Sequence, residues 1–158
     1  MKNPKVRIRN FQREDAEHIV KIHEIAKESF EDIEMNSEFI INSSLRNDFR
    51  FFIATIDDEV VGFIGTLFYE NVGRAEIGPI GIDDKYKNLG IGTNLVEHAL
   101  EFLKEKNIHR VIARVKAENK IGLKFFEELD FKFEAYLKRY TKKCEDVVQM
   151  VRFLPPHL

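Results

Sequence analysis

A strand, a glycine-bearing loop and a helix follow one another in the middle of the chain, and they constrain its fold more than any other segment. Glu76–Ile82 is a largely apolar run that is typical of a buried strand. Apolar residues then recur with helical spacing, which predicts a long helix over Gly90–Lys106. The loop Lys87–Gly92 therefore opens a helix directly after a strand, and this order indicates an α/β fold.

The start of that helix is predicted to bind phosphate. Backbone N–H groups in a first helical turn lack partners, and the helix dipole adds partial positive charge at the same point. Gly90 and Gly92 have no Cβ atom, so phosphate can approach the backbone closely. The segment is not a nucleoside-triphosphatase loop, because no Gly-Lys-Ser/Thr triplet occurs. It is not a dinucleotide fingerprint either, because Leu95 stands where that motif needs a third glycine.

Composition excludes several other classes of protein. A length of 158 residues predicts one domain, 1–158. The net charge of −2 does not indicate nucleic-acid binding. A single cysteine excludes a disulfide framework and indicates a reducing, cytoplasmic compartment. The longest apolar run, Val60–Tyr69, is too short to cross a bilayer, so no membrane partner is expected. The histidines have no metal-ligand spacing, so no metal is expected, and a monomer and a homodimer both remain open.

The remaining pattern predicts alternating strands and helices. Pro79 cannot donate to a sheet ladder, which predicts a local irregularity in its strand, and Asp57-Asp58 predicts a hairpin turn. The predicted strands are Lys5–Asn10, Arg50–Ile56, Glu59–Glu70, Arg74–Ile82, His109–Val115, Phe131–Tyr140 and Asp146–Phe153. The predicted helices are Arg13–Ser29, a helix capped by Ser37 that reaches Arg46, Gly90–Lys106 and Asn119–Leu129. An irregular acidic segment, Phe30–Met35, separates the first two helices. This order predicts a mixed sheet covered by helices.

Two motifs resemble those of the GNAT N-acetyltransferase superfamily. Lys87-Asn88-Leu89-Gly90-Ile91-Gly92 is similar to the [QR]-x-x-G-x-[GA] loop that binds acetyl-CoA. Asn119–Phe131 is similar to the family's second signature, N-x-x-A/G-x-x-F-Y/F-x-x-x-G-F. The resemblance covers nearly the whole chain. It implies a three-layer fold, with a mixed, mostly antiparallel sheet of about seven strands and helices on both faces, and it implies acetyl-CoA as the cofactor.

The resemblance also implies which residues contact the cofactor. Main-chain amides of Leu89–Thr93 would hold the pyrophosphate. The side chain of Asn119 and backbone groups at Ile80 and Ile82 would bind the pantetheine arm, and a backbone N–H near Ile80 would stabilise the oxyanion. The full implied cofactor-binding set is Ile80, Ile82, Lys87, Asn88, Leu89, Gly90, Ile91, Gly92, Thr93, Asn119 and Phe126.

Three positions depart from the family pattern. Lys87 replaces Arg or Gln, which keeps a cation but loses planar bidentate geometry. Asp130 replaces a turn glycine, so it must adopt a left-handed conformation or change the turn. Phe126 stands where many members carry a tyrosine that protonates the leaving thiolate. Members that acetylate histone lysines share this phenylalanine and use a glutamate base, whose position is occupied here by Glu76.

The reaction needs such a base. A lysine-like amine of pKa about 10.4 is only about 0.04% neutral at pH 7, which costs roughly 4.6 kcal/mol. A nearby carboxylate that takes the proton offsets part of this cost. Glu76 is therefore the candidate catalytic residue, although a solvated strand residue would look the same in the sequence. Asn119 is equally compatible with a simple helix cap.

The acceptor stays open at this point. Tyr140 followed by Glu145-Asp146 resembles the N-terminal protein acetyltransferases, but Arg114 and Phe126 occupy the positions of their base and acid, which argues against that group. The acceptor charge is predicted in two conflicting ways. A cationic amine is favoured by the acidic residues Glu28, Glu31, Asp32 and Glu34. The basic residues Lys138, Arg139, Lys142 and Lys143 argue against a cationic amine. The chain is predicted to transfer acetyl from acetyl-CoA to a primary amine of a small molecule, a protein lysine or a protein N-terminus, by direct attack in a ternary complex. The alternative is a non-catalytic acyl-CoA-binding regulatory module.

Overall fold

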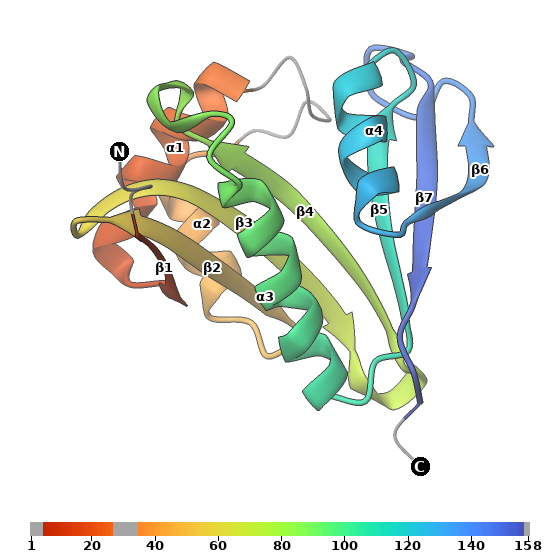
Figure 1. The fold of residues 1–158 in the computed structure, drawn as a ribbon, viewed down its shortest axis with the longest axis horizontal. Coiled ribbons are helices and arrows are strands. Elements are labelled where there is room, and N and C mark those ends of the chain that lie inside the picture. Colours follow the sequence, from red (N-terminus) through yellow and green to blue (C-terminus); the bar gives the residue numbers. More distant parts are fainter. Residues whose placement is uncertain (1–4, 27–34, 157–158) are drawn as a thin grey trace.

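A single seven-stranded sheet runs through the molecule (Figure 1). The computed structural model describes residues 5–26 and 35–156. The strand order is β1-β2-β3-β4-β5-β7-β6, and every neighbouring pair is antiparallel except β4–β5. The strands are β1 (Val6–Asn10), β2 (Phe49–Ile56), β3 (Glu59–Tyr69), β4 (Arg74–Ile82), β5 (Arg110–Lys116), β6 (Lys132–Leu137) and β7 (Val147–Phe153). The predicted mixed, mostly antiparallel sheet is thus confirmed.

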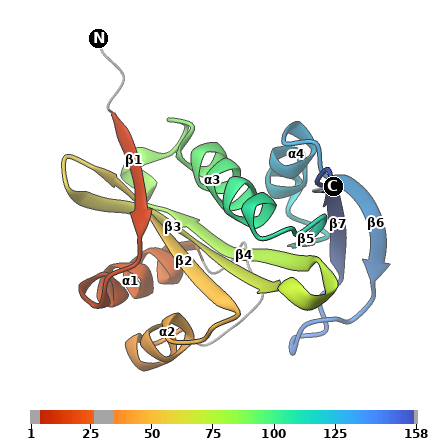
Figure 2. The same ribbon diagram turned by 90° about the horizontal axis from the view of Figure 1, so that it is seen from below.

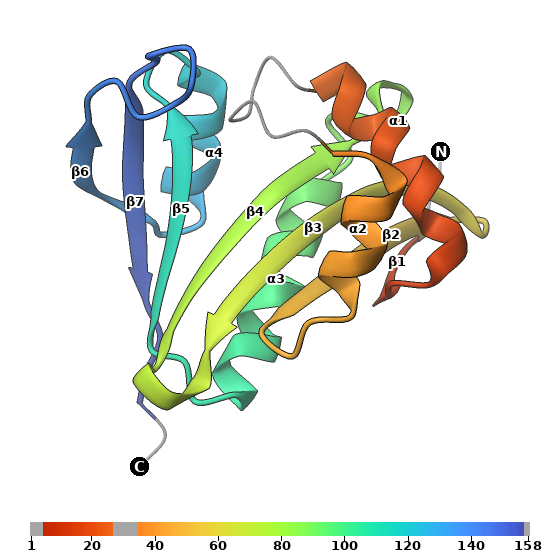
Figure 3. The same ribbon diagram turned by 180° about the vertical axis from the view of Figure 1, so that it is seen from behind.

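Helices cover both faces of the sheet (Figures 2 and 3). Helices α3 (Ile91–Glu105) and α4 (Lys120–Glu128) lie on one face, and α1 (Ala16–Ala26) and α2 (Ser37–Ser44) lie on the other. Each layer has its own buried core. One core joins α3 and α4 to the sheet through residues such as Leu95 and Phe126, and the other joins α1 and α2 through residues such as Ile19 and Phe63. None of the helices in the described ranges is long and apolar enough to cross a membrane.

Strands β4 and β5 separate beyond their first four residues, and this creates the opening that holds the candidate site. Their parallel pairing runs only from Arg74/Arg110 to Ile77/Ala113. Next to this point the register between β3 and β4 shifts, because Ile64 pairs with Ile80 while Thr66 pairs with Ile77. The irregularity predicted at Pro79 is therefore present. Figure 1 shows β4 and β5 close together at one end and apart at the other.

Backbone conformations explain two of the predicted turns. Asp57 and Asp58 both have positive φ (49° and 64°), as a two-residue hairpin turn of the right twist requires. Asp130 adopts φ 65° just after α4, and Phe131 N–H donates to the Phe126 carbonyl at 3.0 Å. This is the usual glycine-type helix ending, so Asp130 keeps the turn at the cost of a left-handed conformation.

Several predicted boundaries were wrong by a few residues. Ser37 is the first residue of α2 rather than its cap. Asn36, with extended backbone, accepts the Phe39 N–H at 2.8 Å through its side chain. Helix α2 ends at Ser44 instead of Arg46, and Arg13–Asp15 forms a 3-10 turn before α1. The predicted end of the first helix at Ser29 lies outside the described residues, as does most of Phe30–Met35.

A buried carboxylate fixes the entry into α1, and its removal should destabilise the fold. Asp15 is 3% exposed, binds the Arg9 guanidinium at 2.8 and 2.9 Å, and accepts the Gln12 N–H at 2.7 Å. Burial alone would raise the pKa of Asp15, but the bonds from Arg9 and Gln12 outweigh it, and the pKa lies below its usual value. Asp15→Asn should lower the free energy of unfolding by about 1–3 kcal/mol at pH 7, because charged hydrogen bonds are lost.

Urea unfolding at several pH values measures this effect. A depressed folded-state pKa contributes stability that is present above the unfolded pKa of about 3.9 and is lost as pH falls below it. The difference between wild type and Asp15→Asn should therefore shrink below pH 4. The exposed pair Arg46–Asp48 provides the control, since Asp48→Asn should have a much smaller effect. An equal loss in both variants would contradict a special role for Asp15.

Candidate active site

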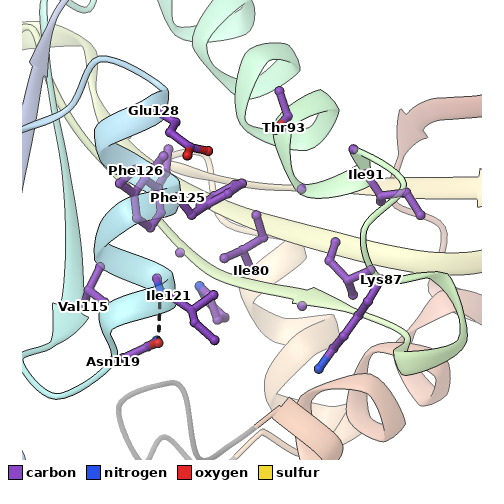
Figure 4. A pocket seen from close by; sticks show the side chains of 18 of the residues that line it. Ile80, Lys87, Ile91, Thr93, Val115, Asn119, Ile121, Phe125, Phe126 and Glu128 are labelled. Atoms are coloured by element: carbon purple, nitrogen blue, oxygen red, sulfur yellow. Dashed lines mark hydrogen bonds between the residues drawn. The ribbon is translucent and has the colours of Figure 1, made fainter.

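One large cavity lies where β4 and β5 separate. Its volume is about 720 Å³, and its walls come from β4, β5, the loop before α3, the first turn of α3 and helix α4. Figure 4 shows Lys87 and Ile91 on one side, Asn119, Ile121 and Phe126 on the other, and Ile80 between them. The backbone edge of β4 after Ile77 is not paired with β5 in the described sheet, so it borders this space.

The N-terminus of α3 opens into the cavity without a side-chain cap. Gly90 is the N-cap with φ 76°, a conformation that favours glycine, and no side chain in the described residues caps the helix. The first turn carries no acidic residue, and Ile91, Gly92 and Thr93 all line the cavity. Unpaired N–H groups and the positive end of a 15-residue helix therefore face the space, which is the arrangement that binds an anionic phosphate.

Gly92 lies close to its neighbour across the cavity. A Cβ atom at this position would lie 3.2 Å from two ring atoms of Phe125 on α4. This distance is shorter than an ordinary van der Waals contact, so a side chain at position 92 would require the Phe125 ring to shift. This contact adds a reason for glycine that the sequence motif does not reveal.

Lys87 lies at the rim of the cavity and already has a partner. Its ammonium group is 2.7 Å from the Asp84 carboxylate, and both side chains are more than half exposed. An exposed pair of this kind contributes about 0–1 kcal/mol and breaks easily. Lys87 can therefore reach an anion in the cavity at little cost.

Helix α4 forms the opposite wall. Asn119 is its N-cap and accepts the Gly122 N–H at 3.0 Å, so the helix-cap interpretation of Asn119 is confirmed. Gly122 leaves room for that cap, because a Cβ there would lie 2.6 Å from the Asn119 amide nitrogen. Phe126 is 6% exposed and packs edge-on against Phe125 and Phe131 at ring-centroid distances of 5.1 and 5.2 Å. It belongs both to the core and to the cavity wall.

Glu76 lines the cavity from β4 and is held by an arginine. Its Oε1 atom is 2.7 Å from Nη1 of Arg114 on β5. The two side chains are 32% and 26% exposed, so both remain accessible to solvent and to a ligand. The carboxylate thus stands at the point where the strands separate.

Tyr86 does not replace the acid that Phe126 lacks. It lines the cavity, but its hydroxyl group donates to Glu59 at 3.0 Å. This hydrogen bond to a carboxylate, followed by desolvation, raises the pKa of Tyr86 above its usual value. A tyrosine whose proton is held in this way is a poor donor to a leaving group.

The structure brings together nearly every residue that the sequence indicated. The cavity is lined by Glu76, Ile80, Ile82, Lys87, Asn88, Gly90, Ile91, Gly92, Thr93, Asn119 and Phe126, and Leu89 is the exception among the predicted residues. The side chain of Leu89 is exposed outside the lining. The wall also contains residues that were not predicted to line it, including Tyr86, Arg114, Ile121, Phe125 and Glu128. Ile121 is 86% exposed, whereas its helical spacing to Phe125 predicts an inward-facing residue, so periodicity alone does not reveal its place in the wall.

The loop between β6 and β7 borders the face of the sheet that carries Glu76. Tyr140 lies in this loop with its ring 5.2 Å from the Arg114 guanidinium carbon, and it is exposed. Tyr136, on β6, is also exposed and donates to Asp146 at 2.7 Å, and neither tyrosine lines the cavity. The cations Lys138, Arg139, Lys142 and Lys143 are exposed in or next to the same loop. The acidic residues Glu28, Glu31, Asp32 and Glu34 lie outside the described residues.

Comparisons with known proteins agree with this geometry. Residues 16–131 match the model of the acetyltransferase (GNAT) family. The chain is 28% identical to an N-alpha-acetyltransferase of Sulfurisphaera tokodaii over 94% of this chain and 93% of that protein. It is 31% identical to human N-alpha-acetyltransferase 30 over 65% of this chain, which corresponds to 29% of the human protein.

Solved structures share the fold at lower identity. Ard1 from Thermoplasma volcanium superimposes with a TM-score of 0.83 at 22% identity, covering 95% of this chain and 98% of that one. The yncA protein of Salmonella typhimurium, solved with its cofactor acetyl-CoA, superimposes with a TM-score of 0.82 at 14% identity, covering 96% and 95% of the two chains. The family model spans most of the chain, and the cavity has the unpaired helix N-terminus that such a cofactor needs. The chain therefore belongs to the acetyltransferase (GNAT) family and is an enzyme that transfers an acetyl group from acetyl-CoA to an amine.

Proposed function

We propose that this enzyme acetylates the α-amino group at the N-terminus of a polypeptide. The observation that carries the proposal is that one cavity is lined both by the open N-terminus of α3 and by Glu76. Relatives that are named N-alpha-acetyltransferases cover nearly the whole chain, which adds support. Arg114 and Phe126 argued against this group at the level of sequence, and the relatives outweigh that argument.

The α-amino group suits a site whose base is already engaged by a cation. At pH 7 an α-amino group of pKa about 8 is about one-tenth neutral, so its deprotonation costs about 1.4 kcal/mol. A lysine side chain costs roughly 4.6 kcal/mol at the same pH. Glu76 accepts a bond from Arg114 through Oε1, and Oε2 is the oxygen available to receive the amine proton. An acceptor that needs little help from a base fits this arrangement best.

The residues of the cavity divide into those that hold the cofactor and those that serve the amine. Main-chain N–H groups from Leu89 to Thr93 would bind the pyrophosphate, and Lys87 would approach it from the rim. Asn119 and the free edge of β4 at Ile80 and Ile82 would border the pantetheine arm, and Phe126 would pack beside it. Acetyl-CoA supplies the acetyl group as a thioester, so a C–N bond forms as the C–S bond breaks. Glu76 would take the proton from the attacking nitrogen, and the thiolate would take its proton from water.

Restoring the family tyrosine should test whether Phe126 faces the reaction. Because Phe126 lines the cavity, we expect Phe126→Tyr to fold and to keep its turnover, or to raise it about two- to threefold by supplying an acid. Steady-state kinetics and thermal unfolding measure the two effects. Phe131→Tyr is the control, since Phe131 is 2% exposed and is not part of the cavity wall.

A hydroxyl group at Phe131 should lower the melting temperature by several degrees, because a buried hydroxyl without a partner is costly. The same loss in Phe126→Tyr, with no gain in rate, would show that Phe126 serves only the core.

Release of free thiol from acetyl-CoA tests the proposal with a panel of acceptors. Short peptides with a free N-terminus should support turnover, whereas the same peptides with a blocked N-terminus and an internal lysine should not. Turnover with lysine side chains or small polyamines alone would contradict the α-amine assignment. Binding of acetyl-CoA without thiol release from any amine would instead favour the non-catalytic binding module, which the named relatives do not favour.

The location and assembly of the enzyme belong to the same proposal. Cys144 is exposed and carries a free thiol, which agrees with a reducing compartment such as the cytoplasm. We propose a cytoplasmic enzyme that works on one acceptor at a time, as a monomer or as a homodimer.

A further inference from the structure

Arg114 contacts three different elements beside the cavity. Its Nη1 atom donates to Glu76 of β4 at 2.7 Å, and its Nε atom donates to Gln149 of β7 at 3.3 Å. Its guanidinium carbon lies 5.2 Å from the ring centroid of Tyr140, within the range of a cation–π contact. The Arg114 side chain therefore joins the candidate base Glu76, strand β7 and the loop between β6 and β7.

Arg114 contacts Glu76 at the end of the ladder between β4 and β5. The parallel ladder between β4 and β5 ends at the pair Ile77/Ala113, and Arg114 is the next residue. The ion pair with Glu76 is therefore a cross-strand tie placed where the two strands part and the cavity begins. Beyond this point the ladder no longer joins the two strands, and the ion pair links them at its end.

The loop that carries Tyr140 is itself firmly held. The Thr141 hydroxyl oxygen accepts the Glu145 N–H at 3.0 Å, and the Glu145 carboxylate lies 3.1 Å from the ammonium group of Lys116. Tyr140 N–H also donates to the Glu145 carbonyl at 2.9 Å. Because the loop is anchored to β5 in this way, the ring of Tyr140 has a defined position against the Arg114 guanidinium.

We propose that Arg114 is a positioning residue that holds the Glu76 carboxylate in one orientation for the incoming amine and fixes the adjacent wall of the acceptor site through Tyr140. The inference rests on the proposed role of Glu76 as the base. A free glutamate samples several rotamers, and selecting one of them before the amine arrives lowers the entropy cost of the reaction. A guanidinium is suited to this task because its planar fork can bind Glu76 and Gln149 at once while its face contacts an aromatic ring.

Arg46 offers a control away from this network. It pairs with Asp48 through Nε at 2.8 Å, and neither residue lines the cavity. Arg46→Met removes an ion pair without touching Glu76, so it should leave turnover within about threefold of wild type.

The test is a kinetic double-mutant cycle over Arg114→Met and Glu76→Gln, with peptide acceptor and acetyl-CoA. Arg114→Met should lower kcat by about 10- to 30-fold and raise the KM for the peptide, while the affinity for acetyl-CoA stays within about twofold. Arg114→Lys should recover part of kcat because it keeps the charge. The kcat of the double variant should be no lower than that of Glu76→Gln alone, because the effect of Arg114 on kcat acts through Glu76. The cycle is repeated with Arg114→Lys, so that the result does not depend on the folding of one variant.

The possible outcomes distinguish the role of Glu76 as the base from the role of Arg114 as a positioning residue. A Glu76→Gln enzyme with normal turnover would remove the base assignment, and the role of Arg114 would fall with it. An impaired Glu76→Gln enzyme beside an Arg114→Met enzyme of near-normal turnover would overturn only the positioning role. Losses that multiply in the double variant would also overturn it, because they would mean that Arg114 acts independently of Glu76.

Discussion

Replacing Glu76 with glutamine is expected to lower turnover by roughly 10²-fold at pH 7 with almost no change in acetyl-CoA affinity. The amide keeps the shape of the side chain and can still accept from Arg114, but it cannot take a proton. A loss confined to kcat is the signature of a group that acts during the reaction rather than in binding. Steady-state kinetics and calorimetry of cofactor binding measure the two quantities.

The pH dependence sharpens this prediction. The rate of Glu76→Gln should rise toward that of wild type above pH 8, where an α-amino group of pKa about 8 is already neutral. Asp48→Asn is the control, because Asp48 is a carboxylate paired with Arg46 and lies outside the cavity wall. It should retain turnover close to that of wild type. Near-normal turnover of Glu76→Gln at pH 7 would show that Glu76 is only a strand residue, and Glu70, Glu118 or solvent would become the alternatives.

Adding a branched side chain at Gly92 is expected to weaken acetyl-CoA binding at least tenfold, about 1.4 kcal/mol. A Cβ atom added at this position would lie 3.2 Å from the Phe125 ring, and the methyl groups of valine would extend into the space between α3 and α4. The same atoms would crowd the unpaired N–H groups where phosphate approaches. Calorimetry with acetyl-CoA measures the loss, and circular dichroism establishes that the variant is folded.

Asn94→Val provides the matched control for Gly92→Val. Asn94 lies two residues further along the same helix and is exposed, so it tests the effect of a β-branched residue near the helix start by itself. Its affinity for acetyl-CoA should stay within about twofold of wild type. Unchanged affinity in a folded Gly92→Val protein would contradict the assignment of the cofactor loop.

The residues that line the cavity at the start of α3 could be predicted from the sequence because local chemistry determines the shape of that loop. A glycine-bearing loop between a strand and an amphipathic helix has one common geometry, and Gly90 adopts the positive φ that this geometry needs. The strand order was not predicted, since periodicity alone does not say that β7 lies between β5 and β6. The boundary at Ser37 was wrong because Asn36 and Ser37 are both good caps, and only the backbone angles distinguish them.

The contacts across the cavity could not be predicted, because they join residues that are distant in the sequence. The pair Glu76–Arg114 spans 38 positions, and its existence depends on where the β4–β5 ladder ends. The contact between Gly92 and Phe125 depends in the same way on how closely α3 and α4 approach. Phe126 looked like a choice between core and site, whereas the structure places it in both.

The most direct test of the proposed acetyl transfer is the position of the acetyl group on a peptide that carries both a free N-terminus and an internal lysine. Tandem mass spectrometry after incubation with the enzyme and acetyl-CoA assigns the modified nitrogen. The proposed function predicts acetyl on the α-amino nitrogen alone, with a rate that falls roughly 10²-fold in Glu76→Gln at pH 7. Acetyl on the lysine nitrogen, or equal labelling of both nitrogens, would contradict it.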